Sequence, residues 1–176
     1  MATGPTYVVR YRRARSGRTN YKHRLNSLKG GMPRLVIRRT GHHIRAQIIN
    51  YERAGDVVLA QASSDDIRKL GWSNALVNSP TAYLVGLLIA VRAKNAQVEE
   101  AIIDLGLSRS IKGNRLYAVV KGAVEGGLNV PHDKEALPSD DRTSGKIIDA
   151  YRKTHLTEDV AKIKEKILTQ KSVSAE

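Results

Sequence analysis

The sequence contains no cysteine. Disulfide bonds, thiolate metal sites and cysteine nucleophiles are therefore excluded. Long apolar runs are also missing, because the longest nearly unbroken one, residues 82–91, is about half the roughly twenty residues that a membrane-spanning helix needs. The first residues lack the apolar segment of a secretory signal. We therefore expect a soluble, cytoplasmic protein.

Acidic residues are missing from the first third of the chain. Residues 1–51 contain twelve Lys or Arg and no Asp or Glu, and the first acid is Glu52. Of the 30 Lys and Arg in the chain, eighteen remain to offset the 17 Asp and Glu, so this first segment holds nearly all of the net charge of +13. A pI of about 10.2 is typical of a polyanion binder. On charge alone the polyanion is a nucleic acid, an anionic membrane or a heparin-like sugar.

The residue types in this segment favour a nucleic acid. Most of the basic residues are arginine, whose planar guanidinium stacks on bases and holds phosphate through two hydrogen bonds. Tyr7, Tyr11 and Tyr21 lie among them and are suited to stacking on unpaired bases. The alternative is a solvated basic arm without a fixed partner, but the basic residues continue into segments whose patterns predict folded structure.

Residues 1–18 have few apolar side chains, and we expect an extended arm that becomes ordered only on its partner. The arm carries the candidate RNA-binding residues Arg10, Arg12, Arg13, Arg15 and Arg18. A short helix with Thr19 as its cap is predicted next, ending at Gly30-Gly31. Its apolar positions are Tyr21, Leu25 and Leu28, and its basic residues are Lys22, Arg24 and Lys29.

Alternating patterns then predict three strands, at 34–39, 43–50 and 57–62, separated by turns. Strands that follow one another in this way favour an antiparallel meander. Leu35 and Ile37 are expected on one face of the first strand, and Arg34, Val36 and Arg38 on the other. The second strand alternates apolar residues with Arg45 and Gln47, so the hairpin has one apolar and one partly basic face.

The pattern changes in the second half of the chain. A helix capped by Ser79, with Pro80 at its first position, is apolar almost all round over 83–93 and is expected to be the buried centre of the fold. Gly86 within it is expected to allow close packing. A buried strand at 101–105, an amphipathic helix at 115–125 and a strand at 128–130 follow, an order that favours parallel pairing.

The C-terminal part is expected to begin with a polar loop over 131–141, followed by helices at about 144–154 and 158–170. Thr157 is the predicted cap of the last helix. Its apolar stripe, Val160, Ile163 and Ile167, is suited to docking on the domain or on a neighbour. The sequence thus predicts a basic arm (1–18), a single mixed α/β domain (19–155) and a C-terminal helical extension (156–176).

No catalytic or cofactor motif is present. Ser144-Gly145-Lys146 lacks the upstream glycine of a phosphate-binding loop, and no Gly-x-Ser-x-Gly motif occurs. His42 and His43 are adjacent, so in a strand they point to opposite faces and cannot share a metal ion. We therefore predict no enzyme activity, no metal and no cofactor.

Asp104 is the one acid in a position that resembles a catalytic one, at the end of a buried strand. Nucleases of the ribonuclease H type hold metal ions there, but they need several carboxylates that converge. Asp56, Glu99 and Glu100 are candidates that no spacing singles out. The favoured alternative is that Asp104 caps a turn or pairs with Arg109 or Arg115.

The segment 106–115 follows a strand, precedes a helix and is basic. Such a loop is suited to binding a phosphate of RNA, although an ordinary solvated loop is an equally good interpretation. Its candidate residues are Arg109, Lys112, Asn114 and Arg115.

The order of several motifs resembles the archaeal form of large-subunit ribosomal protein eighteen, the universal 5S-rRNA-binding family. The motifs are Thr19-Asn20-Tyr21, Arg24-Leu25, Leu28-Lys29, Pro33-Arg34-Leu35-Val36, His43-Ile44-Arg45-Ala46-Gln47, Ala62-Ser63-Ser64, Gly71-Trp72, Asn78-Ser79-Pro80-Thr81-Ala82-Tyr83-Leu84, Asp104-Leu105-Gly106-Leu107, Lys121-Gly122-Ala123, Gly127-Leu128 and Pro131-His132. The resemblance spans roughly residues 5 to 155 and rests on the ordered set rather than on any single motif.

The resemblance implies an α/β fold, a mixed β-sheet flanked by helices with ribonuclease-H-like topology but without catalysis. It implies a structural constituent of the large ribosomal subunit that binds 5S rRNA and anchors it to large-subunit rRNA in the central protuberance, beside the other universal 5S-binding protein. The arm and first helix would reach into rRNA, and the loop 109–115 would be a further contact. The hairpin residues implied to lie on 5S rRNA are Arg34, Arg38, Arg39, His43, Arg45 and Gln47.

Recognition is then expected to depend on RNA shape, phosphates and 2′-hydroxyls, because the A-form major groove is too narrow for side chains to read. Two other functions stay open on the sequence: a metal-dependent nuclease that uses Asp104, and an RNA chaperone that acts outside the ribosome and binds many RNAs.

Overall fold

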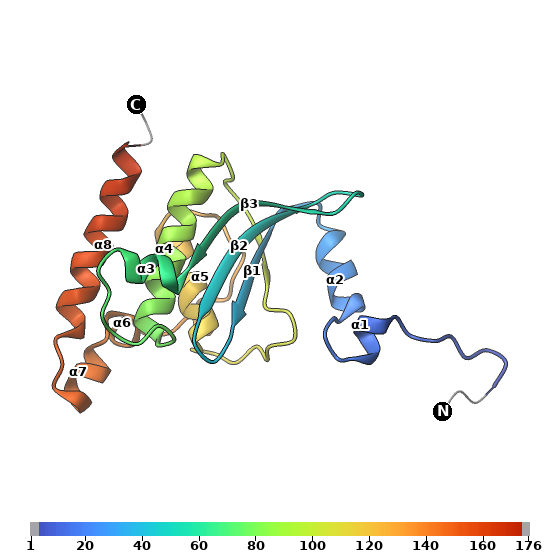
Figure 1. Cartoon of the computed structure of the whole chain (residues 1–176), viewed down its shortest axis with the longest axis horizontal. Coiled ribbons are helices and arrows are strands. Elements are labelled where there is room, and N and C mark those ends of the chain that lie inside the picture. Colours follow the sequence, from blue (N-terminus) through green and yellow to red (C-terminus); the bar gives the residue numbers. More distant parts are fainter. Residues whose placement is uncertain (1–3, 174–176) are drawn as a thin grey trace.

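The computed structural model describes residues 4–173, with side chains up to residue 169. A four-stranded mixed sheet with the order β3-β2-β1-β4 lies at its centre (Figure 1). The strands are β1 (Arg34–Arg39), β2 (Ile44–Tyr51), β3 (Asp56–Ser63) and β4 (Ile102–Asp104). The first three form the predicted antiparallel meander, and β4 pairs with β1 in parallel. The ribonuclease-H-like topology in particular stays a prediction.

The two faces of the sheet differ because side chains alternate along a strand. The inner face, which packs on helices, consists of the buried residues Leu35, Ile37, Ile44, Ala46, Ile48, Ala60 and Ala62. A register shift between Ile48 and Ile49 marks a β-bulge near the end of the β2–β3 hairpin. The opposite, outer face carries most of the polar residues of the meander.

Two helices cover the inner face: α4 (Ser79–Asn95) and α5 (Arg115–Glu125). Every residue from Ser79 to Val91 is buried, so α4 is the predicted centre of the core. Its cap is Asn78 rather than Ser79, since the Asn78 side chain accepts a hydrogen bond from Thr81 N at 2.8 Å. Gly86 meets α5 directly, and a Cβ there would lie 2.1 Å from Val119 O. The close packing predicted for Gly86 is confirmed.

The last helix, α8 (Leu156–Val173), packs on the side of α4 away from the sheet (Figure 1). Its buried residues Leu156, Val160, Ile163 and Ile167 belong to the same core as the sheet, so the stripe docks on the domain itself. Thr157 is not its cap. Asp149 supplies the cap instead, because its carboxylate accepts hydrogen bonds from the backbone N of both Leu156 and Thr157 at 2.8 Å.

The C-terminal half departs from the prediction in several places. The expected helix at 144–154 is present as α7 (Lys146–Arg152), which begins after Gly145, whose φ of +93° is the left-handed conformation that glycine adopts without strain. A separate short helix, α6 (Asp140–Ser144), precedes it. The loop expected over 131–141 contains a 3-10 turn, η1 (Lys134–Ala136), and the start of α6. The strand expected at 128–130 is reduced to an isolated bridge between Asn129 and Glu100.

A short helix that was not predicted, α3 (Ser64–Lys69), follows β3 directly. Ser63 and Asp66 form a capping box at its start, and this spacing is the local signal that identifies such a helix.

The N-terminal part is more ordered than expected, because the segment predicted to be extended contains α1 (Arg12–Arg15). It is followed by α2 (Tyr21–Leu28), whose cap is Asn20 rather than Thr19. The helix α2 stands opposite the outer face of the sheet, on the side away from α4 (Figure 1). None of its residues is buried, so apolar packing contributes little to holding it there.

None of the helices within residues 4–173 combines the length and the apolar character that a membrane crossing requires.

Candidate nucleic-acid interface

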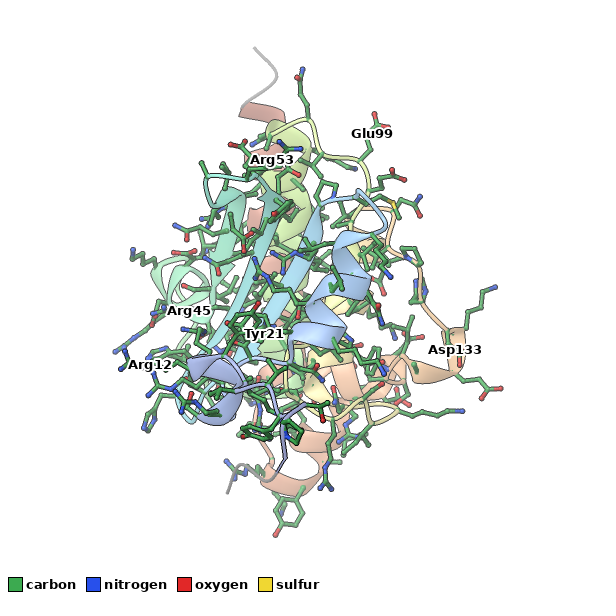
Figure 2. The ribbon with its side chains drawn as sticks, turned by 90° about the vertical axis from the view of Figure 1, so that its right-hand side faces the viewer. Arg12, Tyr21, Arg45, Arg53, Glu99 and Asp133 are labelled. Carbon is green, nitrogen blue, oxygen red and sulfur yellow. The ribbon has the colours of Figure 1, made fainter. Side chains whose placement is uncertain are left out.

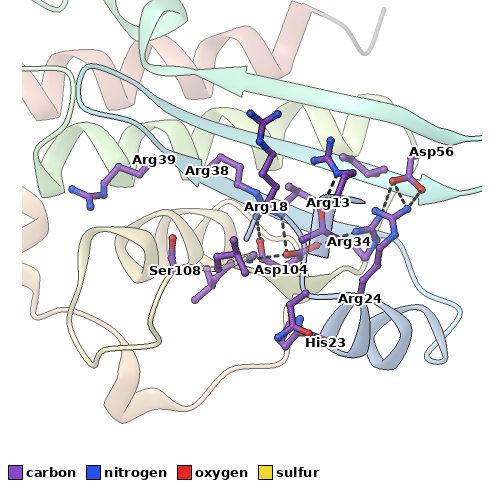
Figure 3. Close-up of a pocket in the computed structure, with 17 residues that line it drawn as sticks. Arg13, Arg18, His23, Arg24, Arg34, Arg38, Arg39, Asp56, Asp104 and Ser108 are labelled. Carbon is purple, nitrogen blue, oxygen red and sulfur yellow. Dashed lines mark hydrogen bonds and ion pairs between the residues drawn. The ribbon is translucent and has the colours of Figure 1, made fainter. Parts of the chain in front are cut away.

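Five charged side chains of alternating sign form a continuous chain across the outer face of the sheet (Figure 3). We call it the ion chain; in order it consists of Arg38, Asp104, Arg34, Asp56 and Arg24. Arg34 is at its centre, with its two terminal nitrogens each 2.9 Å from a carboxylate oxygen, one of Asp104 and one of Asp56. Arg38 lies 3.1 Å from the other oxygen of Asp104. The ion chain therefore joins β4, β1, β3 and α2.

Arg34 has an exposed fraction of only 3%. A buried guanidinium loses its hydration, and the two carboxylates on either side compensate for that loss. A direct contact of Arg34 with RNA stays a prediction, but each of its terminal nitrogens already contacts a carboxylate. Arg34 orients Asp104 and Asp56, which in turn hold Arg38 and Arg24.

Asp104 is buried at the end of β4. Burial opposes its ionisation, but the charge of Arg38 and a hydrogen bond from Gly106 N outweigh burial, so the pKa of Asp104 lies below its usual value. The predicted turn-capping role is confirmed by that hydrogen bond of 2.8 Å. The predicted pairing with Arg109 or Arg115 is wrong, since the partners of Asp104 are Arg34 and Arg38.

Gly106 allows Arg38 to lie flat against the turn after β4. Its φ is +64°, and a Cβ there would lie 2.8 Å from Cζ of Arg38. Arg38 also donates to the backbone oxygen of Asp104 at 2.7 Å. Its side chain nevertheless stays 46% exposed, so part of its guanidinium still faces solvent.

A cavity of about 470 Å³ lies between the α1–α2 segment and the outer face of the sheet. We call it the arm cradle. Its basic lining residues are Arg13, Arg18, His23, Arg24, Arg34, Arg38 and Arg39, and its acids are Asp56 and Asp104 of the ion chain (Figure 3). Because the acids are already paired, the cradle has an excess of positive charge, which favours an anionic partner.

The arm adds exposed aromatic and basic groups beside the cradle. The rings of Tyr11 and Tyr21 lie 5.0 Å apart, and both are exposed. Tyr21 and Arg12 both lie on the face of the molecule shown in Figure 2. The remaining predicted residues of this part, Arg10, Arg15, Lys22 and Lys29, are also exposed and have no carboxylate partner within residues 4–169.

The strand β2 extends the same surface. Arg45 and Gln47 stand on the outer face beside Gln61 and Ser63 of β3 and line a hollow of about 300 Å³. His43 lies at the start of β2, where its Nδ1 is 3.3 Å from a carboxylate oxygen of Asp65. Arg45 is exposed and has no ion-pair partner among residues 4–169, so its guanidinium is available to a partner.

Several residues of the loop predicted to bind phosphate form contacts within the protein. The Asn114 side chain caps α5 by accepting hydrogen bonds from Leu116 N and Tyr117 N. Arg115 donates to Val77 O at 2.7 Å, and Lys112 pairs with Glu135 at the surface. Arg109 is exposed and forms no ion pair in the described part of the chain, so its charge is available to a partner.

The arrangement does not suit metal-dependent cleavage. Asp104 and Asp56 approach one another, but the guanidinium of Arg34 lies between them and provides the positive charge that a metal ion would supply. Within residues 4–169, no three His, Asp or Glu side chains gather as metal ligands would.

Sequence reasoning missed the role of Asp56, which it considered only as a metal ligand. No local signal identifies this role, because its partners Arg24 and Arg34 are 32 and 22 residues away.

Comparison with known proteins finds a matching family and similar proteins. Residues 5–100 and 93–133 match the family described as ribosomal large subunit proteins 60S L5 and 50S L18. The large ribosomal subunit protein uL18 of Methanoregula boonei is 47% identical over 151 residues, which cover 86% of this chain and 87% of that protein. The protein of the same name from Methanospirillum hungatei is 48% identical over 151 residues, with 86% of each chain covered.

Proposed function

Because this chain belongs to the family of ribosomal large subunit proteins 60S L5 and 50S L18, we propose that it binds 5S rRNA and anchors it to large-subunit rRNA in the central protuberance. Membership of the family makes the chain a structural constituent of the large ribosomal subunit and not an enzyme. The finer assignment, to 5S rRNA and to the neighbouring proteins of the protuberance, including the other 5S-binding one, is our proposal.

The arm cradle is the observation that carries this proposal. Two arginines that line it and stay partly exposed, Arg24 and Arg38, are each held by a carboxylate of the ion chain. A side chain that is already positioned loses less conformational entropy on binding than a free one. Phosphates entering the cradle meet guanidinium groups in a fixed arrangement, and this favours RNA of a matching shape over any polyanion.

The exposed surfaces around the cradle then extend the contact. Tyr11 and Tyr21 offer rings for stacking on unpaired bases, and Arg45 continues the basic surface along β2. Each phosphate that is neutralised releases condensed counterions, so binding is expected to weaken steeply as salt increases. The residues proposed to contact RNA remain those named from the sequence, except that Arg34 is assigned to orient Asp104 and Asp56 and Asn114 to cap α5.

The test is a salt titration of the purified protein against 5S rRNA, with tRNA as a competitor. Binding to 5S rRNA that survives excess tRNA and has a steep salt dependence is the expected result. Equal affinity for the two RNAs would contradict selective binding and favour a general RNA chaperone. A protein that fails to sediment with large subunits in cell extracts would contradict the ribosomal assignment as well.

A further inference from the structure

A second group of arginines gathers at the end of the fold where the β1–β2 turn meets the starts of α4 and α5. We call it the arginine end; it consists of Arg39, Arg68, Arg115 and Arg142. Arg68 and Arg115 line one open hollow of about 590 Å³ together with His42 of the turn. The terminal nitrogen Nη1 of Arg142 lies close to Gly113, 3.8 Å from the position that a Cβ would take there.

Three of these arginines, Arg39, Arg115 and Arg142, are close enough for their charges to interact. Arg115 is half-buried, and burial together with the positive charges of Arg39 and Arg142 lowers the pKa of its guanidinium. The four residues come from four different elements, the end of β1, α3, the start of α5 and α6. Only the tertiary structure brings them together, and sequence reasoning did not single out Arg68 or Arg142.

Their charges are not neutralised by the fold. Within residues 4–169 none of the four has a carboxylate within ion-pair distance, in contrast to Arg24, Arg34, Arg38 and Arg92. Arg115 donates only to a neutral backbone oxygen, that of Val77. The nearby acids are already paired: Asp65 with His43, Asp66 with Arg92, Asp140 with Lys121 and Asp141 with Lys146.

Like charges held together disfavour the free protein and favour any state in which an anion lies between them. The anion is unlike a small metabolite, because the hollow is open and the four guanidinium groups are spread over four elements. A polymer with phosphates at regular intervals suits such a surface. Arg39 lines the arm cradle and its charge acts on Arg115, so the arginine end lies next to the cradle.

We propose that the arginine end binds a second stretch of rRNA phosphate backbone, separate from the stretch in the arm cradle. The inference rests on the proposed binding of rRNA and adds a second site to it. The shared chemistry is a phosphodiester backbone, supplied either by 5S rRNA or by the large-subunit rRNA to which 5S rRNA is anchored.

The test compares two double variants of the full-length protein. Arg68→Gln with Arg142→Gln removes two charges from the arginine end. Arg53→Gln with Lys162→Gln removes two exposed charges, one from the far end of the β2–β3 hairpin and one from α8, and neither residue has an ion-pair partner among residues 4–169 (Figure 2). Binding is measured over a range of salt concentrations, first to 5S rRNA alone and then, for the protein–5S complex, to large-subunit rRNA.

The expected result is that the slope of log Kd against log salt becomes shallower by about 2 for the first pair in one of the two titrations, and stays unchanged for the control pair. A shallower slope in the titration with 5S rRNA assigns the arginine end to 5S rRNA. A shallower slope only in the titration with large-subunit rRNA assigns it to large-subunit rRNA. The charge-preserving pair Arg68→Lys with Arg142→Lys is expected to keep most of the slope, which separates loss of charge from loss of folding.

Slopes like that of the natural protein in both titrations, or equal losses in the test and control pairs, would overturn the second site. The proposed function would stand in either case, provided that the natural protein binds 5S rRNA selectively. Failure of the natural protein to bind 5S rRNA would instead overturn the proposed function and this inference together.

Discussion

Arg24 on α2 and Asp56 at the start of β3 are joined by two hydrogen bonds of 2.9 and 2.8 Å, although 32 residues separate them. Because α2 buries none of its residues, this ion pair is its principal polar attachment to the sheet. The same carboxylate also holds the buried Arg34. One acid thus connects the arm, which carries much of the positive charge, to the folded core.

Replacing Asp56 with Asn is therefore expected to loosen α2. Arg24 loses its charged partner, and Arg34 keeps only Asp104, so the free energy of unfolding is expected to fall by about 1–3 kcal/mol. Hydrogen exchange of the amides in α2 is expected to accelerate more than in α4. The control is Glu52→Gln, which removes an exposed acid of the same hairpin that forms no ion pair among residues 4–169. Unchanged exchange in α2 would show that other contacts hold it.

Asp104 makes stability depend on pH. Its pKa in the folded protein lies below its usual value of 3.8, so the unfolded chain takes up this proton first as the pH falls. The stability that the ionised Asp104 contributes is present above about pH 4 and is lost as the pH falls through the folded-state pKa of this residue. Asp104→Asn is expected to lower the free energy of unfolding by about 3 kcal/mol at pH 6, because the buried Arg34 loses one of its two carboxylates. Chemical denaturation measures this difference.

The difference in stability between the natural protein and Asp104→Asn is expected to shrink as the pH approaches 2. Glu99→Gln, which removes an exposed acid at the far end of the molecule, serves as the control (Figure 2). A difference that stays constant over this range would mean that the charge of Asp104 is not the cause. Asp104→Asn is also expected to show no change in any RNA cleavage, because the chain is not a nuclease.

Gly106→Ala is expected to disturb the arm cradle. The added Cβ would meet Cζ of Arg38 at 2.8 Å, and the φ of +64° is strained for alanine. Gly31→Ala is the matched control, because its φ of +66° brings the same strain while no atom lies within 4 Å of the added Cβ. Both variants are expected to lose about 1 kcal/mol of stability, but only Gly106→Ala is expected to weaken 5S rRNA binding, measured by filter binding. Equal binding by both would remove Arg38 from the interface.

Arg45→Ala is expected to weaken binding to 5S rRNA by about 1–3 kcal/mol if its guanidinium contacts a base or holds a phosphate with two hydrogen bonds. Among residues 4–169 Arg45 has no ion-pair partner, so little stability should be lost. Arg53→Ala, at the other end of the same hairpin, removes the same charge and is expected to have a smaller effect (Figure 2). Equal effects on the two affinities would indicate attraction by net charge only.

Gly86→Ala tests the contact between α4 and α5. A Cβ at Gly86 would lie 2.1 Å from Val119 O, and one at Gly122 would lie 2.1 Å from Tyr83 O, so the two glycines allow the backbones to touch. The helices must separate to admit a methyl group, which is expected to cost about 3 kcal/mol or more. Gly41→Ala, with nothing within 4 Å of the added Cβ, should change the unfolding free energy far less. A small decrease in the unfolding free energy of Gly86→Ala would mean that α4 and α5 can shift apart at little cost.

The sequence alone determined the elements that have a strong local pattern. The alternation over 34–39 and 43–50 predicted the meander, and the apolar run over 83–93 predicted the central helix, because periodicity is set by neighbours a few residues apart. Predictions failed where a single residue decides the outcome. Asp149, which lies seven residues before Leu156, caps α8 in place of Thr157.

For the candidate interface, the sequence determined the sign and the location of the charge: a run of arginines without acids over residues 1–51. The tertiary structure decided which of those charges are free. It buried Arg34 between two acids, one of them 70 residues away, and left Arg45 exposed on the next strand. It also gathered Arg39, Arg68, Arg115 and Arg142 from four separate elements. Electrostatic interactions depend on distance in space and on burial, and neither is encoded in the spacing of residues along the chain.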